Sequence, residues 1–236
     1  MIFGAVLAGG SGTRMKGAPL PKQFLPLGDC PILIRTLRVF AACPLLHATF
    51  VTVPAQWQAQ THALVQAHLP QANIFVVPGG ADRTGSLFAA ADAAQAQFGA
   101  HNDDLLVTHD AVRPFVTQQM LRDTIDGAQA CGACSVAVNA IDTILESNDG
   151  QTIDRIPPRS RMYQMQTPQT FRIALLRRAF AALPDAQKAT LTDGCGILVA
   201  QGLPVRLAAG SARNMKITTP DDYALAQALA AAAANG

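Results

Sequence analysis

Short apolar segments alternate with segments of helical periodicity along most of this chain. The apolar runs FGAVLA, ATFVTV, NIFVV, DLLVTHD and CSVAV are of strand length, and helical spacing of apolar residues lies between them. A strand that is apolar throughout is buried on both faces, and a helix after each such strand is typical of a parallel sheet. The alternation therefore predicts an α/β fold whose mostly parallel sheet carries helices on both faces.

The composition limits the class of protein further. Half of the 236 residues are apolar and 14% are charged, which predicts an ordered chain with a sizeable core. No apolar run reaches about 18 residues and no basic segment precedes an apolar one at the start, so we expect a cytoplasmic protein. The formal net charge of +2 gives no indication of nucleic-acid binding. No repeat or linker divides the sequence, which predicts one domain over residues 1–236.

The alternation is interrupted between residues 139 and 169. Here AIDTILES and QTIDRIP, on either side of the turn sequence NDG, predict the two short strands of a β-hairpin. Such a hairpin has little core of its own. We therefore expect an arm at about 139–165 that embraces the second subunit of a homodimer.

The C-terminal third predicts helices at about 173–183 and 192–201, the strands VRLAA and NMKIT, and a final helix. Thr219 is the expected N-cap of this last helix, with Pro220 in the first helical position and two acids behind it. Lys216 thus precedes a helix start at a strand end, where the ligands of open parallel sheets gather.

A glycine-rich loop follows the first predicted strand and contains the sequence GGSGTRMKG. The spacing fails as a Walker A loop, because Ala18 and Pro19 stand where Lys and Ser/Thr are required, and as a dinucleotide fingerprint, because Met15 stands at the third glycine. Glycines let backbone N–H groups approach phosphate oxygens, and Arg14 and Lys22 are placed to close over them. We expect a phosphate-binding loop, with a solvated surface loop as the alternative.

A carboxylate stands at the end of another strand, in the sequence VTHDAVRPF. Asp110 follows the apolar run and could hold Mg²⁺ on a substrate phosphate. The neighbouring His109 is more simply a structural histidine than a catalytic base. We expect Arg113 to pair with an acid, and Pro114 to stiffen the loop.

The five cysteines have no framework spacing, which predicts free thiols. Cys131 and Cys134 form a C-x-x-C, but they stand between a helix end and a strand, and no second pair completes a zinc site. We interpret them as small side chains at a turn.

Six segments resemble, in order, a family of cytidylyltransferases that act on small sugar-alcohol phosphates. They are LAGGSGTRM with PKQFLPLGDCPIL, GGADRTGS, VTHDAVRPF, QTPQTFR, LTDG and NMKITTPDD, and the likeness runs from Phe3 to about Ala226. The family comprises the 2-C-methyl-D-erythritol 4-phosphate and the ribitol-5-phosphate enzymes. Val112 and the arm sequence look more like the ribitol branch, which implies D-ribitol 5-phosphate as acceptor, CDP-ribitol as product and a role in teichoic acid or capsule biosynthesis. The alternative is the methylerythritol phosphate of isoprenoid biosynthesis.

The resemblance implies a Rossmann-like fold of the nucleotidyltransferase type, a divalent cation (Mg²⁺) as cofactor, and a role for each matching residue. Arg14, Lys22 and Lys216 match catalytic residues that contact the CTP phosphates, and Asp110 and Asn214 resemble the metal ligands. Arg159, delivered by the partner's arm, and Thr192 match residues that hold the acceptor phosphate. The positions implied to bind CTP are Leu7, Ala8, Gly9, Gly10, Gly12, Thr13, Gly79, Gly80, Asp82, Arg83 and Ser86.

Position 85 departs from the family pattern, since it is Gly where Asp or Asn is usual. The implied chemistry needs no activated side-chain nucleophile, because the acceptor phosphate attacks the CTP α-phosphate itself and pyrophosphate leaves. Small residues around Ala8, Gly9 and Gly79 favour a pyrimidine over a purine. A non-catalytic nucleotide-binding domain is the alternative from another class, and the failed fingerprint disfavours an NAD-dependent oxidoreductase.

Overall fold

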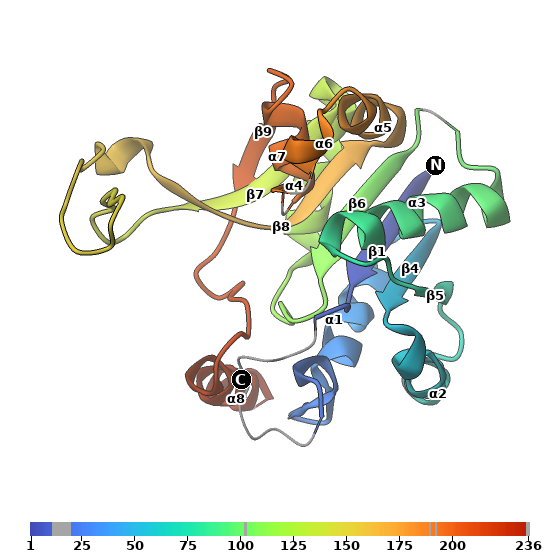
Figure 1. Ribbon diagram of the computed structural model, residues 1–236. Coiled ribbons are helices and arrows are strands. Elements are labelled where there is room, and N and C mark those ends of the chain that lie inside the picture. Colours follow the sequence, from blue (N-terminus) through green and yellow to red (C-terminus); the bar gives the residue numbers. More distant parts are fainter. Residues whose placement is uncertain (11–19, 102, 189, 192, 235–236) are drawn as a thin grey trace.

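The computed structural model describes residues 1–10, 20–101, 103–188, 190–191 and 193–234. It contains a seven-stranded sheet in the order β5-β4-β1-β6-β8-β7-β9 (Figure 1). The strands are β1 (Ile2–Leu7), β4 (Ala48–Val53), β5 (Ile74–Pro78), β6 (Leu105–Asp110), β7 (Ala133–Asn139), β8 (Tyr163–Arg172) and β9 (Arg206–Ala209). A separate two-stranded sheet pairs β2 (Pro26–Leu27) with β3 (Cys30–Pro31).

Helices cover both faces of the large sheet, as the uniformly apolar strands predict. Apolar side chains of α1 (Ile32–Ala41), α2 (Gln58–His68) and α4 (Gln118–Cys131) pack on one face, in a core with Val6, Val51 and Val107. Those of α3 (Arg83–Phe98), α5 (Ile173–Ala181) and α7 (Gly194–Val199) pack on the other. The short helix α6 (Asp185–Lys188) and the 3₁₀ turns η1 (Lys22–Phe24), η2 (Ala55–Trp57) and η3 (Arg159–Arg161) lie between these longer elements.

The predicted parallel sheet is interrupted by one antiparallel strand. β1, β4, β5 and β6 are parallel neighbours, and β7 is parallel to β9, but β8 runs antiparallel to both β6 and β7. The sequence QMQTPQTFR was not predicted to be a strand. It carries polar residues that are buried here by neighbours on both sides, and its conformation depends on those neighbours rather than on an apolar pattern.

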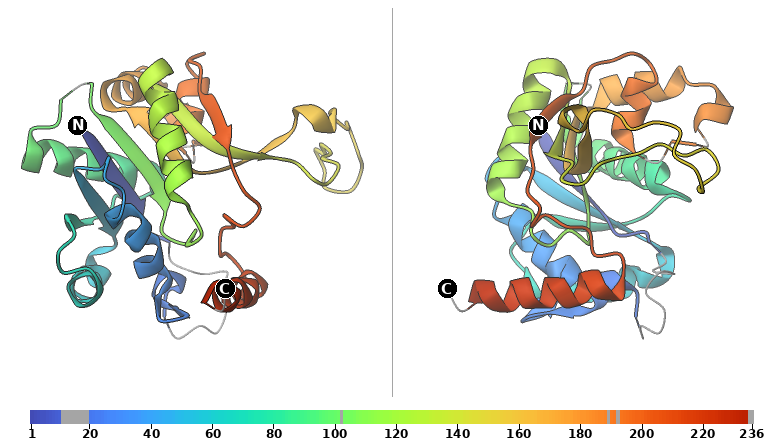
Figure 2. Two further views of the ribbon diagram at one scale, coloured as in Figure 1. Left: turned by 180° about the vertical axis from the view of Figure 1, so that it is seen from behind. Right: turned by 90° about the vertical axis from the view of Figure 1, so that its left-hand side faces the viewer.

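The arm between β7 and β8 projects from the sheet (Figures 1 and 2). The prediction of two further strands in it is wrong, because among its residues only Glu146 and Arg155 form an isolated bridge. The predicted turn is present, with Gly150 at φ +70° and the Asp149 carboxylate accepting from two backbone N–H groups. Ile141, Ile153 and Ile156 are exposed, so the arm of a single chain has too little apolar packing to order a longer ladder.

The final helix α8 (Pro220–Ala234) lies against the segment that follows the glycine-rich loop. Thr219 and Asp222 cap it reciprocally, because each side chain accepts from the other's backbone N–H. The predicted strand NMKIT is not formed; the segment is irregular, and one hydrogen bond from Ile217 N to Val112 O joins it to its neighbour. No helix in the described part of the chain is long and apolar enough to cross a membrane.

Candidate active site

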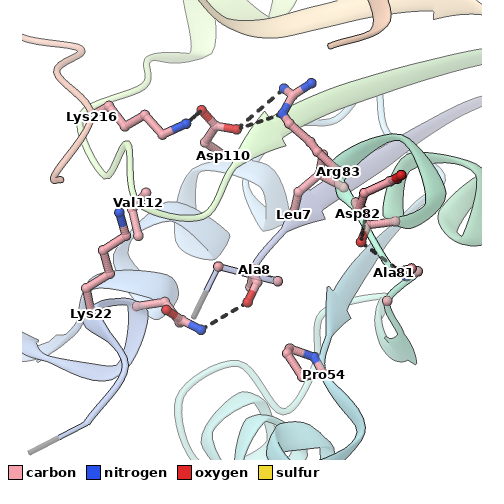
Figure 3. A pocket seen from close by; sticks show the side chains of 16 residues that line it. Leu7, Ala8, Lys22, Pro54, Ala81, Asp82, Arg83, Asp110, Val112 and Lys216 are labelled. Atoms are coloured by element: carbon pink, nitrogen blue, oxygen red, sulfur yellow. Dashed lines mark hydrogen bonds and ion pairs between the residues drawn. The ribbon is translucent and has the colours of Figure 1, made fainter. Parts of the chain in front are cut away.

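A cavity of about 460 Å³ opens at the carboxyl ends of β1, β4, β5 and β6. Parallel strands bring the loops that follow them to one edge of the sheet, which is where ligands of such sheets bind. The lining residues are Leu7, Ala8, Gly9, Gly10, Lys22, Gln23, Pro54, Gly79, Gly80, Ala81, Asp82, Arg83, Ser86, Asp110, Val112 and Lys216 (Figure 3).

Asp110 is the centre of the charged side of this cavity. Lys216 Nζ lies 3.0 Å from its Oδ2, and the Nε atoms of Arg83 and Arg113 lie 3.4 Å from its carboxylate oxygens (Figure 3 draws the first two). Burial alone would raise the pKa of the Asp110 carboxyl, but the charges of Arg83, Lys216 and Arg113 hold it well below its usual range. The pairing expected for Arg113 is confirmed. One anion therefore gathers three cations at the end of β6.

The start of α3 forms the opposite wall. Asp82 caps the helix by accepting from Gly85 N at 2.6 Å, and Gly80 N donates to Ser86 Oγ at 3.2 Å. A Cβ at Gly80 would lie 2.4 Å from the carbonyl carbon of Gly85, so the loop and the helix approach each other as only glycine allows. A Cβ at Gly85 would come within 3.3 Å of Gly80 Cα. The unusual glycine at position 85 thus stands where its neighbours leave little room.

Lys22 and Gln23 reach the cavity from η1. Both are buried, and Gln23 Nε2 donates to the carbonyl oxygen of Ala8 at 3.0 Å. Burial by itself would raise the pKa of the Asp222 carboxyl on α8, but hydrogen bonds from Thr219 and Thr218, with the charge of Lys22, lower it. The charge of Lys22 thus acts on the acidic N-terminus of α8.

A buried hydrogen-bond network joins the backbone of Asp110 to the side chains of Thr167 and His109. His109 Nε2 lies 3.1 Å from Arg113 O, and its Nδ1 lies 2.9 Å from Thr167 Oγ1, which also accepts from Asp110 N. A carbonyl can only accept, so Nε2 carries the proton and Nδ1 accepts from the threonine hydroxyl. Burial lowers the pKa of His109 to about 4, and the imidazole is neutral at pH 7. The structural interpretation of His109 agrees with this geometry.

A model of the IspD family, described as 2-C-methyl-D-erythritol 4-phosphate cytidylyltransferase, matches residues 2–231. The chain belongs to the IspD family. It is thus a CTP-dependent cytidylyltransferase, which sets aside the alternative of a non-catalytic nucleotide-binding domain.

Solved structures of IspD enzymes resemble this chain over nearly its whole length. The 2-C-methyl-D-erythritol 4-phosphate cytidylyltransferase of Thermus thermophilus is 30% identical, with a TM-score of 0.73, 98% of this chain and 100% of that one covered. That of Francisella tularensis is 28% identical, with a TM-score of 0.77 and 95% and 97% covered. The 4-diphosphocytidyl-2C-methyl-D-erythritol synthase of Anaerococcus prevotii, at 24% identity, 97% and 95% covered and a TM-score of 0.78, shares the fold.

The residues present can be tested against the divalent cation expected for an IspD enzyme. The described residues contain no cluster of three or more acidic, histidine or cysteine side chains. Mg²⁺ nevertheless needs only one or two carboxylates when substrate phosphates supply its other ligands, and Asp110 offers one at the cavity wall. Asn214 is fully buried and lines no part of the cavity. Its Nδ2 donates to Gln166 Oε1 and Thr167 O, while its Oδ1 has no partner among the described residues. Asp110 thus fits a cation held mainly by the substrate, whereas the role implied for Asn214 stays a prediction.

The structure brings together most of the residues that the sequence singles out. Leu7, Ala8, Gly9, Gly10, Gly79, Gly80, Asp82, Arg83, Ser86, Lys22, Asp110 and Lys216 line one cavity. Gly12, Thr13, Arg14 and Thr192 lie outside the described residues. Arg159 is exposed on the arm, where its Nη1 donates to Ile141 O at 3.3 Å, and it does not line the cavity of its own chain.

Sequence reasoning missed four residues that contact or support the site. Gln23 is one, and its place next to Lys22 in PKQF was the available signal. Pro54 and Ala81 also line the cavity, each just beyond a predicted strand or glycine pair. Thr167 is the fourth, and it was missed because β8 itself was not predicted.

Proposed function

We propose that this IspD enzyme transfers the cytidylyl group of CTP to 2-C-methyl-D-erythritol 4-phosphate, releasing pyrophosphate. The observation that carries the proposal is the family match over residues 2–231, together with solved relatives of that activity that cover almost the whole chain. This reverses the order of the two acceptors expected from the sequence. It places the protein in isoprenoid biosynthesis, and its location in the cytoplasm stays a prediction.

D-Ribitol 5-phosphate remains the second candidate acceptor because of Val112 and the arm sequence, of which Val112 can be placed at the cavity. Val112, where the sequence looks more like the ribitol enzymes, lines the cavity beside Lys22 (Figure 3). The methylerythritol phosphate enzymes that the sequence resembles commonly carry Ala at this position, and the two extra methyl groups of Val would discriminate between acceptors in contact with this wall by about tenfold to a hundredfold. We therefore propose that Val112 contributes to the choice of acceptor.

The proposed reaction proceeds by positioning and charge stabilisation. An oxygen of the acceptor phosphate attacks the α-phosphorus of CTP, the bond to the bridging oxygen breaks, and pyrophosphate leaves with that oxygen. Lys22 and Lys216 approach the cavity from two different segments and stabilise the charge on the phosphate oxygens. When bound, a divalent cation on Asp110 would supply further positive charge. Arg14 and the backbone of the glycine-rich loop are proposed to complete this set.

Base selection is proposed to follow from the close approach of Ala8, Gly9 and Gly79 to the cavity. Gln23 already engages the Ala8 carbonyl, which fixes the strand end against which the pyrimidine would lie. Equal turnover of ATP and CTP would contradict this part of the proposal.

The acceptor is tested by measuring pyrophosphate release from CTP and Mg²⁺ with each of the two acceptors in parallel. We expect release with 2-C-methyl-D-erythritol 4-phosphate. Release with D-ribitol 5-phosphate alone would overturn the proposed acceptor and keep the residue roles. If pyrophosphate is released with neither acceptor, the proposed chemistry is contradicted.

The homodimer is proposed because the arm exposes apolar side chains and carries Arg159 away from its own cavity. If the partner's Arg159 completes each site with Thr192, the single variants Arg159→Ala and Lys216→Ala are each expected to lose roughly 10²-fold or more in turnover. Mixed and allowed to exchange subunits, the two variants should regain activity, because each mixed dimer holds one site with both residues. No recovery, with exchange verified by mass, would contradict a shared site.

A further inference from the structure

A second cavity, of about 480 Å³, lies behind the wall that carries Asp110. It is lined by Asp29, by Arg35 and Arg38 of α1, by residues 114–117 and by Arg213. The two cavities share no residue, and the segment after β6 separates them: Asp110 and Val112 face the first, whereas residues 114–117 face the second. The two cavities therefore lie on opposite sides of this segment.

The second cavity is strongly positive for its size. Three arginines and one aspartate line it, a net charge of +2, which equals the formal net charge of the whole chain. Like charges gathered around a concave surface focus a positive potential there and raise the local concentration of anions. The charge balance of the lining thus favours an anionic ligand.

Asp29 compensates this charge only in part. Its carboxylate pairs with Arg38 Nη1 at 2.6 Å but lies 4.0 Å from Arg35 Nη1, which instead donates to Leu27 O at 3.3 Å. The guanidinium of Arg213 makes no hydrogen bond or ion pair with any described residue; only its backbone N–H donates, to Ser211 Oγ. Arginine guanidinium groups with unused donors suit phosphate oxygens, which they bind in a bidentate manner.

Most of the remaining lining is apolar, with Thr117 and Ser211 as the uncharged polar residues. Phe115 lies beneath Arg35, with the guanidinium carbon 6.0 Å from the ring centroid, and Val39 and Val116 continue this floor. A cavity of this size accommodates a small organic molecule rather than a bare ion alone. We propose that the second cavity binds a small phosphate-bearing molecule, with its phosphate between Arg213 and the two arginines of α1 and its organic part against Phe115.

Two of the segments that line the cavity, the one after β6 and the one after β9, are hydrogen-bonded to each other at their active-site ends. Arg113 Nη1 donates to Asn214 O at 2.8 Å, and Ile217 N donates to Val112 O at 2.9 Å. Seen from behind, the two segments run beside one another (Figure 2, left). A ligand that draws Arg213 toward α1 therefore acts on the segment that carries Lys216 to Asp110, and its occupancy changes turnover.

Binding is tested by amide NMR on the full-length protein saturated with CTP, with inorganic phosphate as the probe and sodium chloride at equal ionic strength as the reference. We expect phosphate-specific, saturable shifts at residues 115–117 and 211–213. Arg213→Gln should weaken this binding by about tenfold, the loss of one charge-assisted contact. Asp29→Asn should strengthen it, since it removes the one acid of the lining. Arg122→Gln, which changes an exposed arginine outside both cavities, is the control and should leave binding unchanged.

Coupling is tested by kcat at saturating CTP and acceptor, because competition by phosphate in the active site alters only KM. We expect phosphate to change kcat at least twofold relative to chloride in the wild type and in Arg122→Gln, and not in Arg213→Gln. Shifts that chloride reproduces, or that survive Arg213→Gln, would overturn the site. An unchanged kcat with specific binding would overturn the coupling. The binding experiment does not depend on which acceptor the enzyme uses, so its outcome is separate from that of the proposed function.

Discussion

The buried imidazole of His109 should make the stability of this enzyme depend on pH between 6.5 and 4. The side chain is fully buried, and burial lowers its pKa from 6.5 to about 4, so the folded state holds the neutral form throughout this range. The unfolded chain takes up a proton below pH 6.5, and the folded chain does so only near pH 4. The contribution of His109 to stability is therefore complete above pH 6.5 and is lost as the pH falls toward 4.

The size of this effect follows from the two pKa values. Their difference corresponds to about 3 kcal/mol in the free energy of unfolding between pH 6.5 and 4. The replacement His109→Gln removes the titration and leaves a side chain of similar length that can still donate to Arg113 O or accept from Thr167. At pH 7 the variant should lose roughly 1–3 kcal/mol, because it cannot satisfy both buried partners with the same geometry.

Urea unfolding of the wild type and His109→Gln at half-unit steps from pH 7.5 to 4 measures this directly. Other acidic groups titrate in the same range in both proteins, so the difference between the two curves isolates the histidine. We expect the two free energies of unfolding to converge as the pH falls and to meet or cross by about pH 4. Parallel curves, with a constant difference from pH 6.5 to 4, would refute the argument that the imidazole is kept neutral by burial.

Two further substitutions test the cavity walls. In EDTA, the Asp110→Asn variant should bind CTP more tightly than the wild type, because the substitution removes a negative charge beside Arg83, Arg113 and Lys216. With Mg²⁺ its turnover should be roughly 10²-fold slower. Calorimetry measures the affinity for CTP and pyrophosphate release measures turnover, and weaker CTP binding in EDTA would contradict this charge assignment. Gly80→Ala places a Cβ 2.4 Å from a backbone carbon of α3 and should lower the free energy of unfolding, measured by thermal denaturation, by about 1–3 kcal/mol. Gly10→Ala is the control, because nothing lies within 4 Å of its added carbon, and it should lower this free energy much less. Equal destabilisation by the two variants would contradict the close approach at Gly80.

Local sequence determines much of the site in this fold. The strands β1, β4, β5 and β6 were predictable because each is an apolar run of strand length, and β1, β4 and β6 are buried along almost their whole length. Parallel order then brings the ends of these strands to one edge, so Asp110 and the glycine pair at 79–80 could be assigned to one site before any contact was known. The N-cap and acidic first turn of α8 likewise fixed its start.

What escaped the sequence depends on contacts between distant segments. β8 is antiparallel between β6 and β7, and its Thr167 hydroxyl is buried where it donates to His109 Nδ1 and accepts from Asp110 N. Gln169 is buried in the same strand, and its backbone carbonyl accepts from Thr108 Oγ1. The strands expected in the arm do not form, because that segment lacks the apolar packing within one chain that would order a ladder.

The sequence by itself determined the alternating elements, the edge at which ligands bind and the residue types available there, because periodicity and turn chemistry are local properties of the chain. Only the tertiary structure decided that Asp110 forms ion pairs with Lys216 and two arginines and that Gln23 donates a hydrogen bond to the Ala8 carbonyl. It also decided that α1 and the segment after β9 form a second basic cavity. These contacts join residues that are far apart in the sequence. The free energy that favours them comes from burial and charge in the folded molecule rather than from the local conformational preference of each segment.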